Sequence, residues 1–343
     1  MSVFVEKTLA EEGFAATWAR TVTPSVMESS KRSRRRTMFA SLATGITVGL
    51  SVVSVLLQMR AADAAFLASP VNHALVLALA ALAAIGAWVN VLRGRESHEP
   101  SVRKAVEAHF ANILSPDDNA AFGQVIIEDL IGDGVLQDRD YELSANYAGT
   151  YGDCRIRIVE AAAGLARGHR HDRVILSVFR VSLPASLRAD IRIDSRADRL
   201  KALMKDRSDL VSYRVDHDQF DGIFAVASTD MGEAARFITD GLAETLLRVQ
   251  EHLASPLAPG VGEQPRLAAQ ASESSLLLAI ETPANGGAMV ATTPTSAEAL
   301  ARHLIMRFAT APALVDDLHG GPEIPPAFAP LPLSDDPQPT ISV

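Results

Sequence analysis

The chain has 343 residues, of which 48% are hydrophobic and 5% aromatic, and it carries a formal charge of −9 with a single cysteine. Two stretches of more than 20 residues contain no charged side chain. They exclude a wholly soluble globule, because their length matches the ~30 Å hydrocarbon core of a bilayer. One thiol excludes internal disulfides, and the acidic bulk argues against a general nucleic-acid binder, which needs a cationic face.

Charge is divided unevenly along the chain. Residues 1–99 carry 10 basic and 7 acidic side chains, a net charge of +3, whereas residues 100–343 carry 22 basic and 34 acidic ones, a net charge of −12. The overall negative charge therefore conceals two different parts of the chain. The amino-terminal part is basic and apolar, and the remainder is acidic. The parts that we distinguish are residues 1–37, 38–92, 100–319 and 320–343.

Residues 1–37 are predicted to form a cytosolic amphipathic helix, over residues 2–22, and a basic segment. One side of this helix collects apolar side chains and the other collects charged ones. The apolar residues are Val3, Phe4, Ala10, Phe14, Ala15, Trp18 and Val22. Two positions for this face remain open. It lies either in the inner leaflet of a membrane, where anionic lipids attract Lys and Arg, or on a protein surface of the soluble domain or of a partner.

Residues 38–92 are predicted to form a transmembrane helical hairpin. The two apolar stretches, about residues 38–59 and 71–92, are each 22 residues long, which suffices to cross a bilayer with some tilt. A backbone in lipid must satisfy its N–H and C=O groups within the segment, so both spans are expected to be helical. Small residues such as Gly45 and Gly49 allow close helix approach, and a homo-oligomer is therefore among the expected assemblies.

Basic residues near the ends of the two spans predict their orientation, because Lys and Arg resist translocation. These residues are Lys31, Arg32, Arg34, Arg35, Arg36, Arg93 and Arg95, all on the side of the two termini. The short connection carries only Arg60, which Asp63 offsets. The pattern predicts a multi-pass inner-membrane protein with both termini in the cytoplasm. The basic run is interpreted as a topology signal and not as a nucleic-acid site.

Residues 100–319 are predicted to form one cytosolic α+β domain, with a mixed, mainly antiparallel sheet and flanking helices. Antiparallel pairing is expected because the connections are too short for helical crossovers. The predicted strands are residues 141–150, 154–161, 173–183, 190–193, 210–215, 220–228, 275–281 and 288–292. The predicted helices begin near Val102, at a Ser115 cap, at Arg199, after Asp230 and at a capping box of Thr295 with Glu298. Residues 255–272 have the composition of a mobile loop, and residues 320–343, with seven prolines, that of a disordered tail.

The string FDGIFAVASTDMGEAARFIT, residues 220–239, follows the two spans in a way that resembles a bacterial membrane-anchored family, the domain of unknown function three-one-three-seven. The family pattern is Phe-acidic-x-x-Phe-x-Val-x-Ser/Thr-x-Asp-x-x-Glu-Ala-Arg ahead of a helix. The matching residues are Phe220, Asp221, Phe224, Val226, Ser228, Asp230, Glu233 and Ala234. Arg236 comes one position later than the pattern requires, with Ala235 in its place. The resemblance covers about residues 38–310 and implies a topology, not a reaction.

The same residues have a structural interpretation. Phe220 and Phe224 are predicted to face a core from a strand. Ser228 or Asp230 is then placed to accept hydrogen bonds from the first N–H groups of the next helix, with Glu233 completing a capping box three residues after Asp230. A joint of strand, cap and helix accounts for the motif without a ligand.

The sequence holds no Walker loop, G-x-G-x-x-G, G-x-S-x-G, H-E-x-x-H or C-x-x-C motif. Cys154 lies in a predicted strand, where an inert buried thiol is expected. The residues that a Zn²⁺ or Mn²⁺ site would have to use are His169, His171 and His217. His169 and His171 share one predicted turn with Asp172, and His217 lies between Asp216 and Asp218 in another. Adjacent strand residues point to opposite faces, so such a site would have to combine both segments. We interpret both as solvated turns and predict no catalytic residue, metal or cofactor.

These observations favour a non-enzymatic inner-membrane protein whose cytosolic α+β domain mediates protein–protein interaction or assembly at the membrane surface. Its expected partners are the lipid bilayer and an unidentified membrane or cytosolic protein, and not nucleic acid. The alternative is a membrane-tethered small-molecule sensor or metal-dependent hydrolase. A deep pocket lined by convergent charged residues would favour the alternative, whereas a filled core with shallow grooves would favour the binding module.

Overall fold

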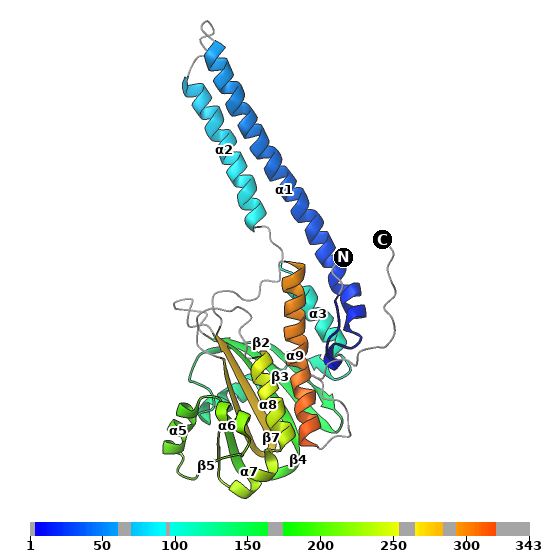
Figure 1. Ribbon diagram of the computed structural model, residues 1–343, viewed down its shortest axis with the longest axis vertical. Helices are drawn as coiled ribbons and strands as arrows, with labels where there is room; N and C mark the ends of the chain where they lie inside the picture. The colour runs from blue at the N-terminus through cyan, green and yellow to red at the C-terminus, as the bar shows by residue number, and fades with distance from the viewer. Residues whose placement is uncertain are drawn as a thin grey trace.

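The computed structural model describes residues 4–60, 70–93, 97–163, 174–253, 265–283 and 293–319. In this part of the chain two long helices project from an α+β domain built on a seven-stranded sheet (Figure 1). All pairs among the described strands are antiparallel, which confirms the main pairing predicted from the short connections, whereas the mixed sheet that was expected is not found among them.

The first long helix, α1 (Phe14–Arg60), follows a short 3₁₀ turn and contains 47 residues, a length of about 70 Å at 1.5 Å per residue. The second, α2 (Pro70–Arg93), packs in the opposite direction along the part of α1 farthest from the domain (Figure 1). Thr47 Oγ1 donates to Ala80 O at 3.0 Å, and Trp88 Nε1 donates to Thr44 Oγ1 at 3.0 Å. The predicted amphipathic helix over residues 2–22 is wrong for residues 4–13, which contain only the 3₁₀ turn Leu9–Glu11. From Phe14 onward, its remaining residues and the first span are parts of one helix.

The sheet has the order β1-β2-β3-β4-β6-β5, and β7 pairs with the other edge of β4. The strands are β1 (Leu114–Pro116), β2 (Tyr141–Tyr151), β3 (Cys154–Ala163), β4 (Val174–Asp194), β5 (Val211–Tyr213), β6 (Ala225–Ser228) and β7 (Arg266–Pro283). β1 approaches β2 so closely that a Cβ added at Gly149 would lie 1.8 Å from Ile113 O, so glycine is required there.

Helices cover both faces of the sheet. The start of α1 and α3, α8 and α9 pack on one face, where the main core lies, and α4 and α5 pack on the other. These elements are α3 (Glu99–His109), α4 (Ala120–Gly132), α5 (Ala197–Asp206), α8 (Asp240–Leu253) and α9 (Pro294–Leu318), with the short helices α6 (Asp218–Ile223) and α7 (Met231–Phe237) beside them.

The apolar face of the amino-terminal segment belongs to the main core. Phe14, Trp18 and Val22 are each no more than 1% exposed, and Phe4 packs on Phe14 with ring centroids 4.8 Å apart. Of the two positions left open by the sequence, the structure shows packing on the domain. The membrane surface is excluded for this face, because its side chains are already covered by protein.

Several predicted boundaries are wrong for identifiable reasons. The strands predicted at 173–183 and 190–193 are one bent strand, β4, since Pro184 and the register shifts around Leu187 bend the ribbon without ending its pairing with β7. Ser115 lies in β1, and the N-cap of α4 is Asn119, whose side chain accepts from Phe122 N at 3.3 Å.

Two more boundaries move along the chain. The cap of α9 is Thr293 with Ser296 rather than Thr295 with Glu298, because Pro294 fits the first helical position. Residues 266–272, expected in a loop, belong to β7. The predicted strand at 288–292, the tail at 320–343 and the rest of the expected loop lie outside the described residues.

Candidate functional site

The motif residues begin in a helix instead of the predicted strand. Phe220 is fully buried within α6, Phe224 ends that helix, and their ring centroids lie 4.8 Å apart. His217 starts α6, because its Nδ1 accepts from Phe220 N at 3.2 Å. The strand begins only at Ala225, so the prediction of a strand over residues 220–224 is wrong. The spacing of Phe220 and Phe224 is compatible with a strand or with a helix. The hydrogen bond to His217 caps the first turn and so favours the helix.

The joint between β6 and α7 is the predicted cap. Asp230 Oδ1 accepts from Gly232 N at 2.7 Å and from Glu233 N at 3.1 Å, and Ser228 Oγ accepts from Asp230 N at 3.1 Å. Glu233 does not complete a capping box. Its carboxylate accepts from the backbone N–H groups of Arg188 and Ala189 in β4, at 2.9 and 2.7 Å. The motif thereby fixes α7 to the bend of β4.

Replacing Asp230 by Ala is expected to destabilise the domain by about 1 kcal/mol, because two N–H groups at the start of α7 lose their acceptor. Asp230→Asn keeps an acceptor oxygen and is expected to retain most of the stability. The measurement is the free energy of unfolding in denaturant. Equal losses for the two variants would show that the cap contributes nothing.

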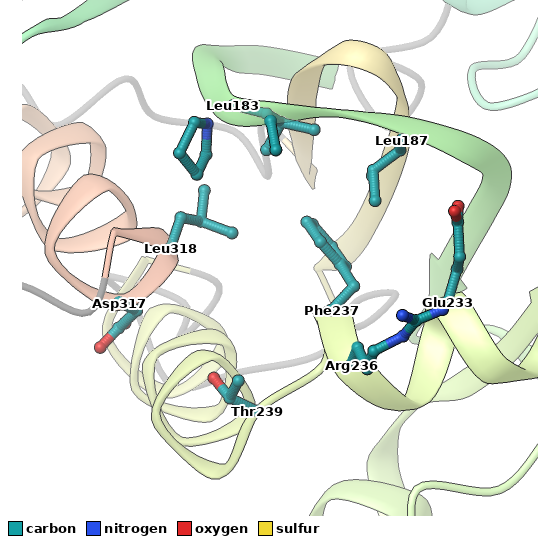
Figure 2. Close-up of a pocket in the computed structure, with 10 residues that line it drawn as sticks. Leu183, Leu187, Glu233, Arg236, Phe237, Thr239, Asp317 and Leu318 are labelled. Atoms are coloured by element: carbon teal, nitrogen blue, oxygen red, sulfur yellow. The ribbon is translucent and has the colours of Figure 1, made fainter.

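A cavity of about 270 Å³ lies beside this joint. Figure 2 shows Leu183 and Leu187 from the bend of β4, Phe237 from α7 and Leu318 from α9 gathered around it. The lining is mainly apolar because the bent ribbon of β4 and the ends of α7 and α9 meet there with their core-facing sides. Such a cavity suits a small apolar group.

The charged residues around the cavity are engaged within the protein. Arg236 Nε donates to Gly232 O at 3.1 Å, and Glu233 accepts from the β4 backbone. Burial raises the pKa of Asp317, opposed in part by a hydrogen bond from Thr245, and Asp317 Oδ2 is buried without a partner among the described residues. These side chains do not converge as a nucleophile and base would.

The predicted metal candidates are not brought together in the described part of the chain. His217 caps α6, while His169 and His171 lie outside the described residues. Among the residues that the structure describes, no three His, Cys, Asp or Glu side chains are arranged to hold a metal ion.

Cys154 is 3% exposed, and its Sγ lies 2.7 Å from His319 Nε2 at the end of α9. Burial raises the pKa of this thiol, with Ser182 opposing the shift by a hydrogen bond. The thiol is therefore protonated at neutral pH, which is the inert state that the sequence predicted.

A buried polar cluster, which the sequence analysis missed, joins the sheet to two helices. Glu160 of β3 is 2% exposed and accepts from Arg103 Nη1 of α3 at 2.8 Å and from Arg307 Nη1 of α9 at 2.9 Å. Arg103 also donates to the hydroxyl of Tyr147, and burial raises the pKa of that tyrosine to about 12. Burial and the neighbouring Arg307 lower the pKa of His303 to about 3, so this imidazole is neutral.

In the sequence, this cluster is indicated only by Glu160, an acidic residue within the otherwise apolar end of a predicted strand. Strand alternation places Glu160 on the same face as Ile156 and Ile158, whereas Arg155 and Arg157 lie on the other. An acid on a core face requires buried cations, but the sequence does not show which arginines supply them.

The apolar segment that leaves the domain lies within α1. Among the described residues, one helix is long and apolar enough to cross a membrane, Phe14–Val53, and its most apolar window is 6% buried. Leu77–Val91 of α2 is a shorter apolar helix. The basic residues Lys31, Arg32, Arg34, Arg35 and Arg36 lie on α1 between the domain and this window. Arg93 is the last residue of α2, and Arg95 lies outside the described residues.

No family model and no curated protein sequence matches this chain. A structural comparison found the crystal structure of the mycobacterial trehalose monomycolate transport factor A, TtfA, which is 13% identical over 55% of this chain and 97% of that chain, with a TM-score of 0.22. A likeness at this TM-score carries no argument about fold or function.

Proposed function

We propose that the protein is a non-enzymatic module of the bacterial inner membrane whose cytosolic domain binds another protein at the membrane surface. The observation that carries the proposal is the continuity of α1. Its first turns are buried in the domain core at Phe14, Trp18 and Val22, and the same helix continues without a break into the exposed apolar window. A domain attached in this way is held at a fixed distance and direction from the bilayer.

The membrane arrangement belongs to the same proposal. We place α1 and α2 across the bilayer as a hairpin, with the domain and both termini in the cytoplasm. Support comes from the antiparallel packing of the two helices and from the basic residues of α1 on the domain side of the apolar window. The resemblance to the membrane-anchored family stays a prediction, since no family model matches the chain. Self-association is a further prediction, since a Cβ added at Gly45 or Gly49 would meet nothing within 4 Å in the isolated chain.

Crosslinking in intact cells tests the proposed function. The full chain is expected to capture the same partner proteins reproducibly, and a matched variant with eight Gly and Ser residues inserted after Ser30 is expected to lose most of that capture. The insertion leaves the domain core and the apolar window unchanged but replaces the rigid helical connection with a flexible one. Membrane fractionation controls for insertion. Capture of only abundant neighbours, alike for both chains, would contradict the proposal.

A second candidate is a membrane-tethered small-molecule sensor, which the cavity beside α7 favours. Its volume of about 270 Å³ and its apolar lining suit a small apolar ligand. Because Glu233 and Arg236 are engaged within the protein, the cavity offers little specificity for a charged ligand, and we rank this function second.

A further inference from the structure

Three arginines lie together on the sheet face that α4 covers only in part. Arg155 and Arg157 alternate along β3, and Arg180 of β4 stands directly opposite Arg157 in the register. They line a groove of about 780 Å³ with Phe122 of α4, and Ser182, Ser274 and Ser275 also line it. α4 covers the neighbouring part of this sheet face, so the groove lies at the end of the face that the helix leaves uncovered.

The charges of this groove are only partly balanced. Arg157 is held by Asp117 at 2.7 Å, and its guanidinium lies 4.3 Å from the centroid of the Phe122 ring. The guanidinium of Arg180 lies 5.6 Å from the same ring, and neither Arg180 nor Arg155 forms an ion pair within the described part of the chain. Like charges directly opposite each other destabilise a sheet. Residues 100–319 carry 22 basic and 31 acidic side chains, a net charge of −9, so the three arginines form a local cationic site on an acidic domain, and such a site suits an anion.

The position of the groove excludes the bilayer as the source of that anion. Its end at Asp153 and Arg155 adjoins the turn between β2 and β3, which contacts the last residues of α9 through Cys154 and His319. Figure 1 shows this end of α9 on the side of the domain opposite to the exit of α1 and α2. Lipid headgroups at the anchor therefore do not reach the groove.

We propose that the groove binds the acidic carboxyl-terminal segment of the same chain, residues 320–343. This segment contains Glu323, Asp335, Asp336 and the terminal carboxylate, and it has no Lys or Arg. It starts after His319, beside the turn that leads into Arg155. Asp335 is sixteen residues beyond His319, a reach of up to about 50 Å for an extended chain, which is ample to pass round the sheet edge.

The spacing of Arg155 and Arg180 allows both side chains to reach one carboxylate. Arg155 and Arg180 occupy diagonal positions on neighbouring strands, which are about 7–8 Å apart. Asp335 and Asp336 are adjacent in the sequence, so in an extended chain their side chains point to opposite sides and one of the two carboxylates faces the sheet. That carboxylate can accept from both arginines. Occupation of the groove by this segment would close it to any other acidic partner, so the inference goes beyond the proposed function and does not depend on it.

Fluorescence anisotropy with a labelled peptide of residues 320–343 tests the inference. The peptide is expected to bind saturably to a chain ending at His319, and at least tenfold more weakly to the full-length protein, whose own segment occupies the groove. Binding to the shortened chain is expected to weaken at least tenfold in R155E/R180E and to fall with added salt. A peptide carrying E323Q, D335N and D336N is expected to bind equally weakly.

The matched control is K201E/K205E, which makes the same change in net charge on α5, outside the groove. It is expected to bind the peptide like the unchanged chain. R155Q/R180Q, a milder change, and the unfolding midpoint of each variant separate loss of the site from loss of the fold. Equal binding by R155E/R180E and the control, or by the neutralised peptide, would overturn the proposal. So would binding of inorganic phosphate without binding of the peptide, because that would assign the groove to a soluble anion.

Discussion

Replacing Glu160 by Gln is expected to lower the free energy of unfolding by about 3–5 kcal/mol. The amide fills the same space but leaves Arg103 and Arg307 without a counter-charge beneath α3 and α9. Removing one partner of a buried pair costs this much because the remaining charge stays desolvated. For a domain of this size the unfolding midpoint should fall by roughly 6–20 °C. The measurement is thermal unfolding of the full-length protein in detergent.

The matched control is Glu142→Gln, which removes the same charge from an exposed position of β2 and is expected to change stability by less than about 0.5 kcal/mol. If Glu160→Gln lost no more stability than Glu142→Gln, the cluster would not hold the helices to the sheet.

The same cluster predicts how stability depends on pH. Burial disfavours the charged form of Glu160, but the charges of Arg307 and Arg103 outweigh it and lower the pKa of this carboxyl in the folded protein. Its contribution is therefore fully present above the pKa of the unfolded chain, about 4.3, and is lost as the pH falls through the lower folded value. Glu160→Gln should flatten this acid limb of the stability curve.

Replacing Trp18 by Ala is expected to cost about 3–5 kcal/mol, the usual range for a large aromatic side chain removed from a core. Trp18 is 1% exposed, and its ring packs on Phe4 and Phe14 at centroid distances of 5.4 and 6.1 Å. The measurement is the free energy of unfolding of the detergent-solubilised chain, together with protease cleavage between the domain and the apolar window.

Met27→Ala is the control on the same helix, since Met27 is 40% exposed. It should change stability little and leave cleavage unchanged. Trp18→Ala should expose the connection to protease, because α1 would no longer be fixed to the domain. If the two variants behaved alike, the amino-terminal half of α1 would be no more than a loose tether.

Local sequence patterns predicted most elements of the domain. Strand periodicity located β2 and β3, and short connections predicted antiparallel pairing. Ser228 and Asp230 were the two predicted caps, because a short acceptor directly before a helix has few other roles, and the structure shows that the cap is Asp230. The prediction failed at α6, because its aromatic residues occur in strands as well as in helices. It also failed at Pro184, where a bend within β4 was interpreted as the end of a strand.

The candidate sites depended on contacts that no local pattern encodes. Glu160 meets Arg103 and Arg307 across sequence separations of 57 and 147 residues. The alternation of Arg155 and Arg157 with apolar residues is typical of a strand with one solvated face, but only the strand register places Arg180 beside them.

By itself the sequence determined the apolar stretches, the basic residues before the first of them and the division into a +3 amino-terminal part and a −12 remainder. These properties follow from composition and short-range periodicity, so no packing is needed to read them. Only the tertiary structure decided that the amphipathic residues from Phe4 to Val22 are core and that α1 continues from that core into the apolar window. An apolar helix face is attracted equally to lipid and to protein, and the choice is made by whichever surface the rest of the fold brings against it.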